Sequence, residues 1–277
     1  MSDVNSSEST TATPVPRDVI VVEGPETAEY LHGQVSQDIL DLEIGESRLS
    51  LLLEPRGRLE VLFRVTRAGD DVFVLDSDPG AGTLLRSSLE RFKLRTKAEF
   101  SEPGWSMLAV RGPDAAEVAQ QAEGEVVAAA ILPVGGFDVF GPAPRSDNDP
   151  DPRHAESRAA AGLPVMGVDL REGDIPNETG LLDLAVSFTK GCYRGQELVE
   201  RIDSRAGGRR TLMRFAADGS LEVGDALDTA DPAGLGGEVR SVVETQAGTV
   251  GFALVDASAD DATHSSGVAV KVAPVVS

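Results

Sequence analysis

The sequence of 277 residues is poor in the residues that build disulfides and metal sites. It contains one cysteine, Cys192, which excludes an intramolecular disulfide and any metal site made of cysteines alone. Its three histidines, His32, His154 and His264, are far apart in the sequence and lack ligand spacing, so no stable metal is predicted. No apolar run approaches the length of a membrane span. We therefore expect a cytoplasmic, monomeric protein that does not contact membranes.

Positive charge is also scarce. The chain has 25 lysines and arginines against 46 aspartates and glutamates, which gives a net charge of −21. Such a surface repels phosphate backbones, so direct binding of nucleic acid is not expected. The acidity fits either a salt-adapted proteome or a GC-rich genome, and the sequence does not separate the two.

The order of predicted elements favours an α+β protein with a small antiparallel barrel at its C-terminal end. Residues 1–16 are rich in Ser, Thr, Pro and acids and are expected to be disordered. Strands and helices then predict a first α+β unit at 17–104 and a second at 105–207. The second unit contains the cysteine segment and a mobile loop at 142–156. Short strands with glycine turns predict the barrel at 208–277.

The cysteine segment is the most unusual stretch of the chain. Cys192 lies between Gly191 and Gly195 and between the cations Lys190 and Arg194. The residues after it predict a helix, so the thiol is expected in a loop just before a helix N-terminus, where amides and cations favour a thiolate. The alternative is an inert, buried cysteine, which is the usual case for a lone thiol.

Residues next to the thiol are expected to tune its pKa or to stabilise the loop and the helix. Lys190 is the expected cause of a lowered thiol pKa, and Gln196 is expected to bond the loop or a ligand. Glu197 and Arg201 are spaced i,i+4 and are predicted to pair, which would orient the helix below Cys192.

Residues 190–197, KGCYRGQE, resemble the KGCYxGQE signature of the YgfZ family, with Tyr193 at its centre. That family shares its fold with the folate-binding T-protein, the aminomethyltransferase of the glycine cleavage system. Five further stretches resemble the family in the same order, namely residues 30–38, 53–58, 91–95, 158–169 and 175–178. The resemblance implies a T-protein-like fold of two α+β units with antiparallel sheets and a C-terminal barrel.

The resemblance also implies a function. Members of this family bind folate and assist the assembly or repair of iron–sulfur clusters in client enzymes, some of which modify tRNA. The expected ligand is tetrahydrofolate or a related folate, and the expected partners are iron–sulfur client or assembly proteins. A single activated thiolate could form a mixed disulfide or lend one ligand to a cluster in transfer, but could not hold a cluster alone.

One departure from the pattern bears on catalysis. The amine-transferring relatives carry an Asp-Asp pair after the hairpin glycine, and the matching positions here are Glu60 and Val61. A tetrahydrofolate-dependent aminomethyl- or methyltransferase is therefore only an alternative to the accessory function. A second alternative is a thiol-based redox-sensing interaction protein. The preferred reading of Glu60 is an exposed strand residue.

Besides Gln196, three residues are candidates for holding the folate. Asp138 falls where folate-binding relatives have a carboxylate that accepts the paired N–H donors of the pterin; the alternative is a strand residue facing water. Arg158 is a candidate partner for the glutamate tail or for an internal acid. Glu178 could hold the pterin or tie the cysteine loop down, and the second role is preferred.

Overall fold

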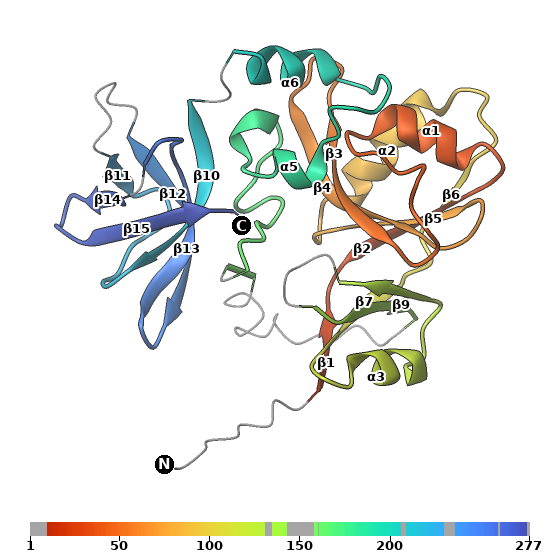
Figure 1. The fold of residues 1–277 in the computed structure, drawn as a ribbon, viewed down its shortest axis with the longest axis horizontal. Helices are drawn as coiled ribbons and strands as arrows, with labels where there is room; N and C mark the ends of the chain where they lie inside the picture. Colours follow the sequence, from red (N-terminus) through yellow and green to blue (C-terminus); the bar gives the residue numbers. More distant parts are fainter. Residues whose placement is uncertain are drawn as a thin grey trace.

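The computed structural model describes residues 10–130, 135–142, 158–159, 161–205, 209–229, 236–259 and 261–275. Three β-structures make up its framework (Figure 1), and all their strand pairs within sheets are antiparallel. The fold is therefore the predicted one, two α+β units and a C-terminal barrel. The sequence also predicts a strand at 131–134, and this segment lies outside the described residues, as does the loop predicted at 142–156 apart from Pro142.

The larger sheet has the strand order β3-β4-β5-β2-β6. Its central strand β4 is buried along nearly its whole length, which explains the almost continuous apolar sequence around Phe63. Helices α1 and α2 lie against this sheet. The bounds are β2 Asp18–Glu23, β3 Ser47–Leu53, β4 Leu59–Arg67, β5 Val72–Ser77, β6 Glu99–Ser101, α1 Thr27–Gln34 and α2 Gly82–Lys93.

The smaller sheet begins with a strand that the sequence did not predict. Thr11–Val15 forms β1, which pairs along its length with β7, so the expected disorder of residues 1–16 is wrong for this segment. The β-branched Thr and Val residues favour a strand, and Pro14 is tolerated because β1 lies at the sheet edge. The order is β1-β7-β9-β8, with β7 Ser106–Arg111, β8 Val126–Ala129, β9 Phe137–Gly141 and helix α3 Ala115–Gln121.

The C-terminal strands close into a barrel in the order β10-β13-β12-β11-β14-β15. Closure leaves the barrel without free edges, and its interior is filled by side chains such as Phe215, Val239 and Val255. The strands are β10 Arg210–Ala217, β11 Ala226–Thr229, β12 Gly237–Thr245, β13 Gly248–Asp256, β14 Asp261–His264 and β15 Ala269–Pro274.

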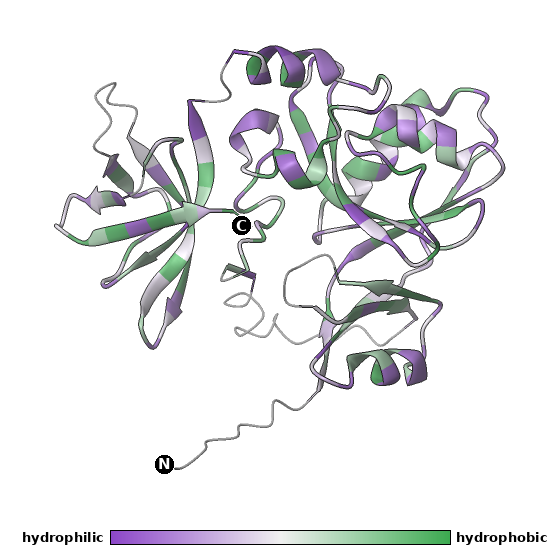
Figure 2. Cartoon of the chain, viewed as in Figure 1, coloured by the Kyte–Doolittle hydropathy of each residue, from purple (hydrophilic) through white to green (hydrophobic). Residues whose placement is uncertain are grey.

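The segment between the smaller sheet and the barrel returns to the larger sheet. It contains the 3-10 helix η1 (Pro176–Glu178), α5 (Leu182–Ala185) and α6 (Gln196–Asp203). Its buried residues Tyr193 and Val199 belong to the same hydrophobic cluster as the strands of the larger sheet. In Figure 2 α6 carries both polar and apolar colours, in keeping with one buried and one exposed side. The cysteine loop is thus built on the first sheet, although it follows the second in sequence.

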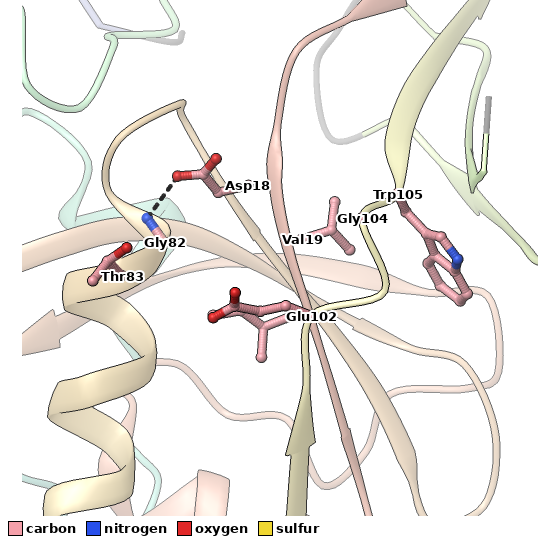
Figure 3. Close-up of a pocket in the computed structure, with 8 residues that line it drawn as sticks. Asp18, Val19, Gly82, Thr83, Glu102, Gly104 and Trp105 are labelled. Carbon is pink, nitrogen blue, oxygen red and sulfur yellow. Dashed lines mark hydrogen bonds between the residues drawn. The ribbon is translucent and has the colours of Figure 1, made fainter. Parts of the chain in front are cut away.

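A cleft between β2, the start of α2 and the segment before β7 is drawn in Figure 3. Asp18 points at the first turn of α2, and its Oδ2 accepts the amides of Gly80 and Gly82 at 2.8 and 2.9 Å. Glu102 lines the same cleft and pairs with Arg86 at 3.0 Å. Both carboxylates are therefore engaged in holding the fold. No helix among the described residues combines the length and apolarity that a membrane crossing requires.

Candidate functional site

Cys192 is exposed and lies in the loop that immediately precedes α6. The prediction of a loop before a helix is confirmed, and the alternative of a buried, packed cysteine is wrong. The neighbouring Gly191 is also exposed, and a Cβ built on it would meet no atom within 4 Å. The tip of the loop therefore projects into solvent.

Lys190 anchors one side of the loop. Its Nζ donates to the carbonyl oxygens of His32, Val35 and Gln37 at 2.6, 2.8 and 2.9 Å. It also lies 5.4 Å from the centre of the Tyr193 ring. Burial lowers the pKa of Lys190 to about 8, and the nearby Asp38 partly opposes this shift. The ammonium is thus committed to the end of α1, and its expected influence on the thiol stays a prediction.

Arg194 anchors the other side of the loop. Its Nε donates to the carbonyl of Leu53 at 2.7 Å, and its Nη2 lies 2.6 Å from the Glu60 carboxylate. Ser88 accepts from the same guanidinium and donates to Glu60 at 2.5 Å. The guanidinium also lies 4.6 Å from the centre of the Phe92 ring. Arg194 therefore ties the loop to the β3–β4 hairpin and to α2.

The environment of Glu60 differs from the prediction. It is 6 % exposed, so the reading of an exposed strand residue is wrong. A lone carboxylate in an apolar strand is unfavourable unless it is paired, and Arg194 and Ser88 provide the pairing. The position that matches the acidic pair of the transferring relatives is therefore filled by a structural ion pair.

Two glycines allow the loop to approach the hairpin. Gly57 and Gly195 both have a positive φ, of 86° and 80°. A Cβ on Gly195 would lie 2.6 Å from the carbonyl oxygen of Glu54, and a Cβ on Gly57 would lie 2.4 Å from the Cβ of Leu198. Only glycine fits at either position without a shift of backbone. The hairpin stretch 53–58 and the cysteine stretch are thus in direct contact.

The end of α1 completes the support of the loop. The amide of Arg194 donates to the carbonyl of Gly33, and the amide of Ser187 donates to the carbonyl of Ser36. Ser36 Oγ donates to the carbonyl of Ala185 at 2.6 Å and accepts from the amide of Leu51. Residues of four separate stretches, 30–38, 53–58, 88–92 and 190–197, therefore meet around the thiol loop.

The remaining residues predicted near the thiol stabilise α6 or face solvent. Gln196 accepts the amide of Tyr193 at 3.2 Å and donates to Glu200 at 2.5 Å, so it holds the loop, as one of the two predicted roles requires. Glu197 and Arg201 are both exposed. These two described residues form no ion pair with each other, and the predicted pair is wrong. Their expected role in orienting the helix loses its basis.

A second group of charged residues lies between the two sheets. Asp138 is 4 % exposed and is held by Arg64 at 2.5 Å and by Arg111 at 2.6 Å, so the alternative of a strand residue facing water is wrong. Burial alone would raise the pKa of Asp138, but the two guanidinium groups outweigh it and lower that pKa. Arg64 also bonds Asp76 at 2.6 Å and stacks on the Phe140 ring at 4.7 Å.

Arg158 joins the same network from the opposite side. Its guanidinium donates to Asp78 at 2.6 Å, which fits the predicted pairing with an internal acid. Asp78 also pairs with Arg17 and accepts the amide of Met166 at 2.8 Å. Burial opposes ionisation of Asp78, but Arg17 and Arg158 overcome it and lower its pKa to about 2. Arg17 continues to Asp76 at 2.7 Å, so the chain of ion pairs is continuous.

These ion pairs line a central cavity of about 80 Å³. Its walls are mixed, because Leu49, Met107 and Leu163 stand beside the charged groups. Asp138 and Arg158 are brought together in this cavity, whereas Glu178 is not. Glu178 lines a separate small cavity with Asp169 and Arg240 at the junction with the barrel.

Most members of the central network were not predicted from the sequence. They come from separate stretches of the chain, and only their pairing gives them a role; these residues are Arg17, Arg64, Asp76, Asp78 and Arg111. Arg64 carried a usable signal, since it interrupts the apolar run of residues 61–65 and a charge in such a run requires a buried partner.

The side chains that line the central cavity suit a folate chemically, but the cavity is too small to hold one as it stands. Arginines suit its carboxylates, a buried aspartate suits the pterin donors, and apolar side chains suit its flat rings. A cavity of this volume is well below the roughly 300 Å³ of a site for a drug-sized ligand. Binding a folate would thus require movement of some lining side chains. Among the described residues, no three His, Cys, Asp or Glu side chains are grouped so that they could hold a metal ion.

Comparison with known proteins defines the class first. Residues 18–138 match the GCVT N-terminal domain. The crystal structure of the glycine cleavage system aminomethyltransferase T from Bartonella henselae superposes with a TM-score of 0.75 at 19 % identity, covering 95 % of this chain and 84 % of that one. The protein therefore has the aminomethyltransferase T fold.

Sequence relatives define the family within that class. A tRNA-modifying protein YgfZ from Edwardsiella ictaluri is 30 % identical over 231 residues, 73 % of this chain and 69 % of the relative. A mitochondrial iron-sulfur cluster assembly factor IBA57 homolog from Pyricularia oryzae is 28 % identical over 228 residues, 74 % of this chain and 58 % of the relative. The chain belongs to the YgfZ family.

Proposed function

We propose that this protein is a cytoplasmic, folate-binding accessory protein that supports assembly or repair of iron–sulfur clusters in client enzymes. Its effect on RNA is indirect, through clients that modify tRNA. Cys192 is the reactive group, and the central cavity is the folate site. Relatives named as tRNA-modifying and as iron–sulfur cluster assembly factors support this assignment.

The observation that carries the proposal is the contrast between Cys192 and its neighbours. Lys190, Arg194, Gly195 and Gln196 are all engaged in holding the loop on the larger sheet. Cys192 is the exposed residue that this support presents to solvent. A rigidly supported, exposed thiol suits exchange with a client disulfide, in which the client S–S bond breaks, one client sulfur leaves as a thiolate and a mixed disulfide forms. It also suits a role as one ligand to a cluster in transfer.

The position of Glu60 argues against the transferase alternative. A general acid or base must reach the proton that it moves. The Glu60 carboxylate instead accepts from Arg194 and Ser88 in a buried pair below the thiol loop, and it does not line the central cavity. A bound folate would act either as a one-carbon carrier or as a flat ligand that orders the side chains of the cavity. Arg158, Arg111 and Asp138 would hold it.

We expect Cys192→Ser to abolish function without loss of stability. The thiol is exposed, so the hydroxyl replaces it without a cavity or a lost buried contact. In cells that lack this protein, the variant should fail to restore the activity of an iron–sulfur enzyme that the wild type restores. The melting temperature should change by less than about 1–2 °C, which corresponds to about 0.5 kcal/mol. Full restoration by the variant would refute a thiol-dependent role.

We expect the purified protein to bind tetrahydrofolate, and Asp138→Asn to weaken that binding about tenfold or more. The amide keeps the shape of the carboxylate but loses the charge that aligns Arg64 and Arg111 and accepts pterin donors. Calorimetric titration measures the affinity, with the exposed Asp70→Asn as the matched control. Turnover of a methylamine donor with tetrahydrofolate would contradict the accessory role, and equal affinity of the Asp138 variant would contradict the assigned cavity.

A further inference from the structure

A wide cleft lies outside the central network. It has a volume of about 360 Å³ and is lined by parts of the 42–49 segment, by Ala129 at the end of β8 and Ala130 after it, and by Leu184 of α5. Leu42 and Leu49 give it an apolar floor. Its volume is sufficient for a large apolar side chain or a small ligand.

Exposed apolar side chains lie on the chain segments that adjoin this cleft. The described residues include eight large hydrophobic side chains that are exposed; one of them, Leu184, lines the cleft, and four more lie on segments next to its lining residues. We call these five the apolar rim; they are Leu40, Ile44, Val127, Leu184 and Phe188, with exposures between 37 % and 62 %. Single exposed apolar residues need no explanation, but a cluster around a cleft marks an interaction surface.

Hydrogen bonds fix the two sides of the rim against each other. Gln37 Nε2 donates to the carbonyl of Leu184 at 2.8 Å, and the amide of Ser187 donates to the carbonyl of Ser36 at 3.0 Å. On the other side, the amide of Ala129 donates to the carbonyl of Gly45 at 3.4 Å. In the sequence, Phe188 is four residues before Cys192, on the segment that leads to Lys190. The segments of the rim are therefore held together by hydrogen bonds, and one of them leads into the loop of the proposed reactive site.

The charges around the rim are mostly negative. Acidic side chains on the same segments are Asp38, Asp41, Glu43, Glu46 and Asp183. Arg48 lines the cleft, but its guanidinium is held by Asp41 at 2.6 and 3.0 Å. This local field repels phosphate groups, anionic lipid surfaces and the carboxylates of a free folate. It also disfavours a second copy of this chain, which carries a net charge of −21.

We propose that the cleft and the apolar rim dock a partner protein that inserts an apolar side chain flanked by lysine or arginine. The inference rests on the proposed accessory function, because such a protein must bring its client next to Cys192. The apolar contact supplies affinity, while the acidic border selects a basic partner surface and increases the association rate at low salt.

The test uses synthetic peptides as the probe. Each peptide carries a photoreactive benzophenone residue at the centre of a short Leu-Phe core, which is flanked by two lysines in one peptide and by two glutamates in the other. After irradiation with the full-length protein, mass spectrometry locates the sites of labelling. We expect the lysine-flanked peptide to label residues 40–48 and 184–188 at least tenfold more than the glutamate-flanked peptide, with the difference shrinking in high salt.

Variants of the rim provide the controls. Phe188→Ser and Leu184→Ser should each reduce labelling about tenfold, and both positions are exposed enough for the fold to persist, which circular dichroism can verify. The exposed Leu94→Ser, on the C-terminal side of α2, is the matched control and should leave labelling unchanged. Equal labelling by the two peptides, labelling mainly elsewhere, or indifference to Phe188→Ser would overturn the proposal.

The outcome is separable from that of the proposed function. Labelling of the rim together with full activity of Cys192→Ser would retain the docking surface and refute the thiol-dependent role. Absence of rim labelling together with loss of function in Cys192→Ser would refute the docking surface and retain the thiol-dependent role.

Discussion

Gly195→Ala is expected to destabilise the protein by about 3–5 kcal/mol and to abolish function. Gly195 precedes α6 with a φ of 80°, a conformation that L side chains rarely adopt. Its Cβ would lie 2.6 Å from the carbonyl oxygen of Glu54 and 2.8 Å from the Cβ of Leu53. Both neighbours belong to the β3–β4 hairpin or its turn, so relief requires the thiol loop to leave the sheet. Chemical denaturation measures the loss of unfolding free energy.

Gly191→Ala is the matched control for this experiment. Gly191 lies in the same loop, and a Cβ there meets open space. Its unfolding free energy should stay within about 0.5 kcal/mol of the wild type. Similar stability of the two alanine variants would show that the hairpin does not constrain the loop in solution, and the account of a rigidly presented thiol would fail.

Arg64→Met is expected to cost about 3–5 kcal/mol of stability, because removal of one partner leaves buried carboxylates without their charge balance. Arg64 is the central cation of the network, in contact with Asp76 on one side and Asp138 on the other. Methionine fills part of the volume but donates no hydrogen bond. Arg111→Met provides the control: Arg111 has 26 % of its side chain exposed, and Asp138 keeps Arg64 in that variant. The control should lose less than about 2 kcal/mol.

The pH dependence distinguishes lost charge pairing from lost packing. In the wild type the pKa values of Asp78 and Asp138 are lowered, so their stabilisation is present above the usual aspartate range and is lost as acid protonates them, for Asp78 between about pH 4 and pH 2. Without Arg64, burial raises the pKa of Asp138 relative to its value in the wild type. The deficit of Arg64→Met should therefore be largest near pH 7 and smaller near pH 4. An equal deficit at both pH values would assign the effect to packing.

Local sequence patterns were sufficient to predict most of the helices and strands. Apolar runs bounded by turn residues predict strands at 48–54, 59–66 and 237–243, and the observed strands β3, β4 and β12 begin at residues 47, 59 and 237. The strand β1 was missed because its sequence, TATPV, is short and polar, and its stability comes from pairing with a strand far along the chain. Composition alone could not show that partner.

The same limit applies to the candidate site. The run KGCYRGQE revealed the loop, its exposure and the helix after it, since glycines, cations and a helical pattern are local signals. It could not reveal that Lys190 and Arg194 are committed to carbonyl oxygens and to Glu60, because those partners lie more than 130 residues away. Nor could it show that Glu178 belongs to a different cavity from Asp138.

The pairing of β1 with β7 has a consequence for how the chain acquires its structure during synthesis. Thr11 lies opposite Arg111, so β1 is synthesised one hundred positions before its partner. The five strands of the larger sheet are all made in that interval. The two sheets therefore cannot mature strictly one after the other, and contacts this distant along a chain slow folding. Until β7 is synthesised, the nascent chain therefore carries β1 as an unpaired segment joined to the larger sheet, and unpaired strand segments are prone to aggregation.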